Sequence, residues 1–70
     1  MSQCSIEDTG LDNFYLRTPF DDNLRLKIRS IPSDSRVWDE ELKVWIIDWN
    51  YYDFIQDAVR EIFGERATVQ

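Results

Sequence analysis

Hydrophobic and polar positions along the chain predict the element order strand, helix, strand, strand, helix. Residues 13–18 are rich in strand formers and stop at Pro19, which indicates a first strand. Residues 36–38 and 44–49 are β-branched and aromatic runs joined by a short polar segment, which is typical of a hairpin. Asp39 is suited to open the turn of this hairpin, because its carboxylate can accept hydrogen bonds from backbone amides further along.

The apolar residues before Pro32 fit both the spacing of a helix and the alternation of a strand. Thr18 is placed to cap a helix that has Pro19 in its first position, and Asp21 completes a capping box. Residues 24–29 also alternate as a half-buried strand would, so periodicity alone leaves both alternatives open. The capping residues favour the helix. Its predicted apolar face consists of Phe20, Leu24, Ile28 and Ile31.

A second helix is predicted from Asn50, which can cap it, to Gly64, which can end it in the left-handed conformation. Its apolar stripe consists of Phe54, Ile55, Ala58, Val59 and Ile62. Both helices are one-sided, so each must cover an apolar surface. The sequence therefore predicts an α+β fold of order β-α-β-β-α. It has a three-stranded antiparallel or mixed sheet with the two helices packed on one face.

The domain prediction places one folded unit over residues 13–64. Residues 1–12 are mostly polar and contain Gly10, which indicates a flexible N-terminal tail. Residues 65–70 follow the predicted end of the second helix and are expected to be frayed.

Composition disfavours an enzyme acting alone. The chain has 70 residues, a single cysteine and no histidine, which removes zinc-finger sites, thioredoxin-like chemistry and histidine-activated nucleophiles. The acidic residues lack the spacing of a calcium loop, so no metal or cofactor is predicted. No apolar run approaches the length of a membrane span, and the first nine residues do not resemble a signal peptide. These observations predict a cytoplasmic binding or interaction module that does not associate with a membrane.

The charge distribution is uneven. Fourteen acidic and eight basic residues give a net charge of −6, which is the wrong sign for a simple nucleic-acid clamp. Five of the eight cations, however, lie in residues 23–49. The six arginines against two lysines, together with the acidity, are typical of proteins that stay soluble in high salt, as in a halophilic source.

One constellation in this central segment is distinctive. Ile31 and Pro32 end the predicted first helix, Arg-x-Trp-Asp follows at 36–39, and Lys-x-Trp follows at 43–45. This spacing resembles the HARP domain, a small module that accompanies annealing helicases, and similar pieces precede phage repair helicases. The resemblance covers roughly residues 14–63. It implies a small sheet with two helices that contacts branched or forked DNA, with DNA or a repair helicase as partner. The matching motif positions are Arg36, Trp38, Asp39, Lys43 and Trp45.

Arg36, Trp38 and Lys43 of this motif also belong to a candidate nucleic-acid site. An exposed aromatic ring stacks on an unpaired base, and neighbouring arginine or lysine contacts phosphates. The structural alternative is that Trp38 and Trp45 form a cross-strand pair within the sheet and that the cations form a solvated surface. The candidate nucleic-acid-binding residues are Arg25, Lys27, Arg29, Arg36, Trp38 and Lys43.

A second candidate site has a different chemistry. Trp49, Tyr51 and Tyr52 follow Trp45 closely, and a core this small is not expected to bury all four rings. An exposed aromatic patch marks a protein partner or a homodimer interface. The structural alternative is that these rings close one end of the core.

Overall fold

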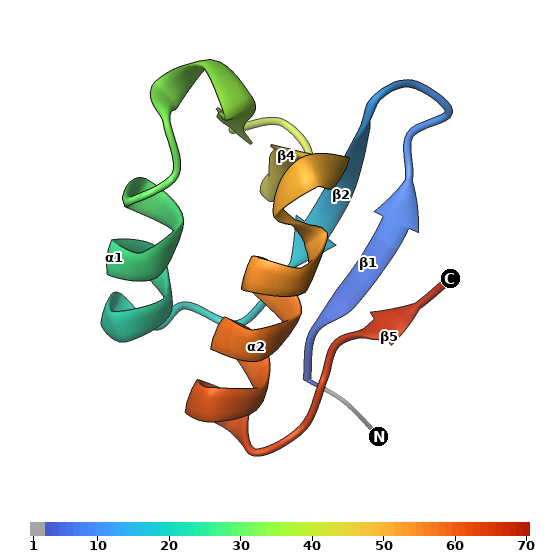
Figure 1. The fold of residues 1–70 in the computed structure, drawn as a ribbon. Helices are drawn as coiled ribbons and strands as arrows, with labels where there is room; N and C mark the ends of the chain where they lie inside the picture. The colour runs from blue at the N-terminus through green and yellow to red at the C-terminus, as the bar shows by residue number, and fades with distance from the viewer. Residues whose placement is uncertain (1–2) are drawn as a thin grey trace.

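The computed structural model describes residues 3–70 and shows an α+β fold with two helices and a five-stranded sheet. The strands are β1 Ser5–Asp8, β2 Asn13–Arg17, β3 Arg36–Asp39, β4 Val44–Asp48 and β5 Thr68–Val69, and the helices are α1 Asp22–Arg29 and α2 Tyr52–Phe63. The order across the sheet is β3-β4-β2-β1-β5. Both helices lie on the same side of the sheet (Figure 1). The predicted class is thus confirmed, whereas the predicted three-stranded sheet lacks β1 and β5.

Residues 5–8 of the segment predicted as an N-terminal tail form β1, a strand in the interior of the sheet, and residues 1–2 of that segment lie outside the described part of the chain. Strand β1 pairs antiparallel with β2, with Ile6 opposite Leu16, and it pairs parallel with β5 on its other side. Cys4 and Ile6 are buried in the core. The turn into β2 is fixed by Asp8, whose Oδ1 accepts the Gly10 N–H at 2.8 Å. The tail prediction was wrong for this strand because Ile6 is its one apolar residue, and one of its two partner strands, β5, lies at the far end of the chain.

The C-terminal residues, predicted to be frayed, form β5. The backbone N–H groups of Thr68 and Gln70 donate to the carbonyls of Cys4 and Ile6 at 2.9 and 2.8 Å. Ala67 is buried just before the strand. The last segment is therefore anchored to the sheet edge by backbone hydrogen bonds, which a composition-based prediction does not detect.

Helix α1 starts later than predicted. Asp21, not Thr18, is its N-cap, and its Oδ1 accepts the Leu24 N–H at 3.0 Å. Leu24, Ile28 and the following Ile31 are buried, as expected for the apolar face. Phe20 precedes the helix and is 80% exposed, so its predicted place on that face is wrong.

The predicted hairpin is present as β3 and β4. Trp38 pairs with Trp45 across the two strands. The Asp39 Oδ1 accepts the Leu42 N–H at 2.9 Å, as the turn prediction required. Lys43 completes the turn with a left-handed φ of 57°. The polar residues before β3 form a short 3-10 helix, Ser33–Ser35.

Helix α2 begins two residues after the predicted Asn50 cap. A 3-10 turn, Trp49–Tyr51, precedes it, and the Asp48 side chain accepts the Asn50 N–H at 2.8 Å. Phe54, predicted in the apolar stripe, is exposed. Gly64 ends the helix with φ 82°, and its N–H donates to the Arg60 carbonyl at 2.9 Å, as predicted.

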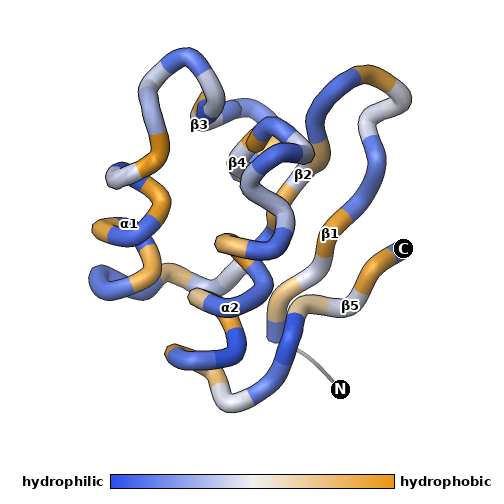
Figure 2. The backbone as a smooth tube through the Cα atoms, in the orientation of Figure 1, coloured by the Kyte–Doolittle hydropathy of each residue, from blue (hydrophilic) through white to orange (hydrophobic). Residues whose placement is uncertain are grey.

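The core lies between the helices and one face of the sheet. Its buried members include Ile6, Phe14, Leu16 and Ile47 from the sheet, Leu24 and Ile28 from α1, and Ile55 and Val59 from α2. Hydrophobic and hydrophilic positions alternate along both helices in Figure 2, as expected for elements buried on one side. Among residues 3–70, no helix is both long enough and apolar enough to span a bilayer.

Candidate functional site

A pocket of about 550 Å³ lies between α1 and the β3–β4 hairpin. Leu24 and Ile28 of α1 and Trp45 of β4 are apolar members of its lining, and charged residues from both sides complete it. The full lining is Thr18, Pro19, Phe20, Asp21, Leu24, Arg25, Ile28, Arg29, Arg36, Trp38, Lys43 and Trp45. Five of the six candidate nucleic-acid residues, all except Lys27, therefore border one pocket.

Three arginines supply positive charge to this pocket. Arg25 and Arg29 are four residues apart on α1, which is about one helical turn. No ion pair within residues 3–70 joins Arg25, Arg29 or Arg36 to a carboxylate. Their charges are therefore available to an anionic ligand.

Arg36 also joins the two sides of the pocket. Its Nε donates to the Ile31 carbonyl at 2.9 Å, and an Nη donates to the Arg29 carbonyl at 3.4 Å. These carbonyls lie at the end of α1, where helix carbonyls lack partners within the helix. The guanidinium thus fixes the start of β3 against α1 and keeps its charge at the pocket.

Three aromatic residues accompany the cations. Trp38 and Trp45 pack edge to face, with ring centroids 5.3 Å apart, so the predicted cross-strand pair is present. Trp45 is half-buried and packs against the core, whereas Trp38 is 44% exposed. Phe20 is largely exposed at the pocket. Trp38 therefore serves the hairpin and also offers ring surface to solvent.

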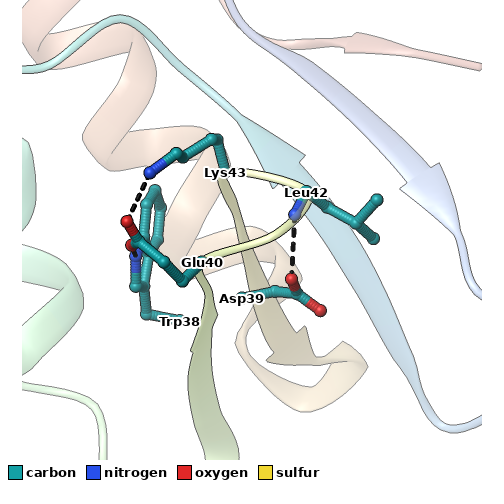
Figure 3. Close-up of polar contacts among 5 residues, drawn as sticks. All are labelled: Trp38, Asp39, Glu40, Leu42 and Lys43. Carbon is teal, nitrogen blue, oxygen red and sulfur yellow. Dashed lines mark hydrogen bonds and ion pairs between the residues drawn. The ribbon is translucent and has the colours of Figure 1, made fainter.

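Glu40 is the acidic residue that binds these pocket residues directly. Its Oε2 accepts the Trp38 indole N–H at 2.6 Å, and its Oε1 accepts a hydrogen bond from Lys43 Nζ (Figure 3). The hydrogen bonds from Lys43 and Trp38, with the charge of Lys43, lower the pKa of Glu40 below its usual value. Glu40 is therefore a carboxylate at neutral pH, held over the hairpin by two donors.

Two charged residues of the central segment, Lys27 and Asp34, lie outside this pocket. Lys27 points toward α2, where its Nζ pairs with Glu61 at 3.2 Å, and it does not line the pocket. Asp34 lines a second, smaller hollow with Val37 and Ile46 from the helix-free face of the sheet. The acidity of the hairpin region is thus divided between two faces.

Trp49, Tyr51 and Tyr52 are half-buried and pack against the core. The ring centroids of Phe14 and Trp49 are 4.9 Å apart, and those of Trp49 and Tyr52 are 5.5 Å apart. The Tyr52 hydroxyl accepts a hydrogen bond from Gln56 Nε2 at 3.2 Å. These three residues therefore pack against the core, and only part of each side chain is left for a partner.

Sequence reasoning missed Phe20 as a site residue because it placed this ring inside the first helix. The available signal was the consecutive pair Asp21 and Asp22, since an aspartate is a strong N-cap and the next acidic residue favours the first turn. A helix starting after Asp21 leaves Phe20 outside its apolar face. Asp21 itself also lines the pocket, although its side chain is engaged by the Leu24 N–H.

The arrangement combines cations, an apolar floor and exposed rings. Flat aromatic groups can stack on the rings while phosphates bind the guanidinium groups. Within residues 3–70, no group of three or more histidine, cysteine, aspartate or glutamate side chains is positioned to hold a metal ion. The cations and rings of the pocket are groups that bind a ligand with both phosphates and aromatic rings.

The chain was compared with protein-family models, with curated proteins and with solved structures, and no match was found in any of the three comparisons.

Proposed function

We propose that this chain is a non-catalytic module that binds single-stranded or forked DNA in the pocket between α1 and the β3–β4 hairpin. The observation that carries the proposal is the meeting of Arg25, Arg29 and Arg36, all without acidic partners in residues 3–70, with the exposed rings of Phe20 and Trp38. Stacking of an unpaired base on such a ring contributes about 1–3 kcal/mol. The arginines then bind the adjacent phosphates.

The net charge of −6 is compatible with this proposal because binding depends on the local potential at short range. The pocket gathers four cations from two elements, and Asp21 is the one carboxylate residue in its lining. Repulsion from the rest of the surface is screened beyond about 10 Å at 0.1 M salt. The expected result is measurable but modest affinity that requires unpaired bases.

The resemblance to the HARP domain supports the same proposal. Four of its motif residues, Arg36, Trp38, Lys43 and Trp45, border the pocket. Asp39, the fifth, forms the hairpin turn that carries Lys43. Membership in that family and association with a repair helicase stay predictions.

The test is a binding titration with fluorescein-labelled oligo-dT, a fork and a blunt duplex, each at 25–300 mM NaCl. Each phosphate of a single strand that a cation neutralises steepens the slope of log affinity against log salt by about 0.7. The double variant Arg25→Ala/Arg29→Ala should therefore flatten the slope by about 1.4. The matched control is Arg60→Ala/Arg66→Ala, which removes the same charge outside the pocket lining and should flatten the slope far less.

The proposal predicts that oligo-dT and the fork bind more tightly than the blunt duplex. An equal decrease of affinity in the two double variants would contradict binding at this pocket. If the chain is folded by circular dichroism but binds none of these DNA probes at 25 mM NaCl, the proposal is wrong. Concentration-dependent dimerisation in the same sample would then favour the protein-interaction alternative around Trp49.

A further inference from the structure

Glu40 occupies a position at which two donors of the pocket converge. The indole N–H of Trp38 and the ammonium of Lys43 both point to its carboxylate (Figure 3). Trp38 and Lys43 belong to the pocket lining, and Glu40 does not. The donor pair is thus arranged to hold an anion, and a carboxylate from the hairpin turn supplies it.

The hydrogen bonds of Glu40 are open to solvent. The side chains of Lys43 and Glu40 are 66% and 72% exposed, and the two residues are three apart in sequence. Exposed ion pairs of this kind are weak and screened by salt. The turn beneath them is better fixed, because Asp39 accepts the Leu42 N–H at 2.9 Å. A ligand anion can therefore replace the carboxylate while the hairpin turn that carries the donors keeps its conformation.

We propose that Trp38 Nε1 and Lys43 Nζ form a phosphate subsite at the rim of the pocket, and that Glu40 competes with the phosphate of a bound single strand for these two donors. This inference rests on the proposed function. A phosphodiester oxygen carries charge that matches the one it displaces, and charged donors and indole N–H groups both bind it. Trp38 and Phe20 both line the pocket and are exposed, so a base attached to that phosphate can stack on either ring. A carboxylate ligand would leave these rings unused.

Competition by Glu40 predicts a specific change in the salt dependence of DNA binding when the carboxylate is removed. While Glu40 neutralises Lys43, this lysine releases no counterion when a strand binds. Removing the carboxylate charge adds one released counterion and removes one repelling charge near the phosphate. Affinity and salt dependence therefore rise together.

The experiment compares Glu40→Gln with Glu41→Gln in the full chain, using fluorescein-labelled oligo-dT at 25–300 mM NaCl. Glu41 is the neighbouring exposed acid, so its variant removes the same charge from the same turn. Glu40→Gln should bind about two- to fivefold more tightly at low salt and should steepen the salt slope by about 0.7. Glu41→Gln should leave the slope unchanged.

A second variant tests Lys43 directly. Lys43→Asn suits the left-handed turn position and removes the charge. In the Glu40→Gln background it should return the salt slope to the wild-type value. A double variant that keeps the steeper slope would overturn the assignment of Lys43 to the subsite.

The outcomes separate this inference from the proposed function. If the wild-type chain binds with a slope sensitive to Arg25 and Arg29, and Glu40→Gln behaves like Glu41→Gln, the subsite is wrong and the function stands. If neither the wild-type chain nor Glu40→Gln binds DNA at 25 mM NaCl, the function is wrong as well. If polyglutamate displaces labelled DNA from Glu40→Gln as well as unlabelled oligo-dT does, the phosphate assignment is replaced by an acidic protein partner.

Discussion

Gln56 is the polar side chain that the core buries within residues 3–70, at 2% exposure. Its Oε1 accepts the Ala67 N–H at 2.8 Å, and its Nε2 donates to the Ala67 carbonyl at 3.2 Å. Helix α2 thus satisfies both backbone groups of the residue that leads into β5. A buried backbone group without a partner costs about 1–3 kcal/mol, so one amide stabilises the whole C-terminal segment.

We therefore expect Gln56→Leu to lower the free energy of unfolding by about 2 kcal/mol, measured by urea denaturation. Amide hydrogen exchange at Thr68 and Gln70 should accelerate by more than the global destabilisation explains, because β5 is no longer anchored. Asp57→Leu places the same side chain on the exposed side of α2 and serves as control. An unchanged urea midpoint for Gln56→Leu would contradict this role.

Cys4 is buried in the core directly before β1. Desolvation, with a smaller contribution from the charge of Glu65, raises the pKa of Cys4 from 9.0 to about 11. At pH 8 this lowers the thiolate fraction about 100-fold relative to the unfolded chain. Because the folded chain holds this proton more tightly, the thiol's contribution to stability is complete below pH 9 and is lost as pH rises through about 11.

Iodoacetamide should accordingly alkylate Cys4 in the native chain at pH 8 at least about 100-fold more slowly than in 8 M urea. The rate, followed by mass spectrometry, should rise with pH beyond pH 9. Native and unfolded chains reacting at similar rates would show that Cys4 is not held in the core.

At the scale of elements, two possible N-caps compete for the start of α1: Thr18 and Asp21. Thr18, Pro19 and Asp21 form a plausible helix start, yet the observed cap is Asp21, one turn later. The difference decides whether Phe20 is buried or presented to the pocket. Capping therefore controls the composition of the candidate site.

Asp21→Ala should lower the free energy of unfolding by about 1 kcal/mol, the usual effect of removing an N-cap. Thr18→Ala should change it by less than about 0.5 kcal/mol, since the residue lies outside the helix. Both values come from urea denaturation monitored by circular dichroism. A larger effect for Thr18→Ala would place the helix start where the sequence pattern alone puts it.

Strong local patterns were predictable from the sequence. The hairpin turn at Asp39, the Trp38–Trp45 pair and the end of α2 at Gly64 all depend on residues near one another in the chain. β1 was missed because Ile6 is the one apolar residue within it, and β5 was missed because its partner strand lies more than 60 residues earlier in the chain. The cations were identifiable, but their common pocket depends on where α1 starts and on the hydrogen bonds that Arg36 makes to carbonyls at the end of that helix.

At the scale of the whole molecule, acidic residues outnumber basic ones, and few of the carboxylates form ion pairs among the described residues. The three ion pairs within residues 3–70 are formed by partly or largely exposed side chains, and pairs of this kind contribute little. A net charge of −6 on 70 residues therefore produces self-repulsion that salt relieves.

Raising NaCl from 0.05 to 1 M should increase the melting temperature, measured by circular dichroism. About 1 kcal/mol of relieved repulsion corresponds to about 4–8 °C for a domain of this size. The same salt change should weaken DNA binding, so stability and affinity move in opposite directions. A melting temperature that falls with NaCl would show that the ion pairs outweigh the repulsion.

The tryptophan signals test directly whether DNA occupies the pocket between α1 and the β3–β4 hairpin. The chain has three tryptophans: Trp38 and Trp45 line the pocket, and the half-buried Trp49 packs against the core. Their indole N–H groups give three separate signals in a nitrogen–proton correlation spectrum of the labelled protein. On titration with oligo-dT at low salt, the Trp38 signal should shift most as its N–H exchanges Glu40 for phosphate, the Trp45 signal should shift less, and the Trp49 signal should stay in place. A shift of Trp49 with Trp38 unmoved would contradict DNA binding in this pocket.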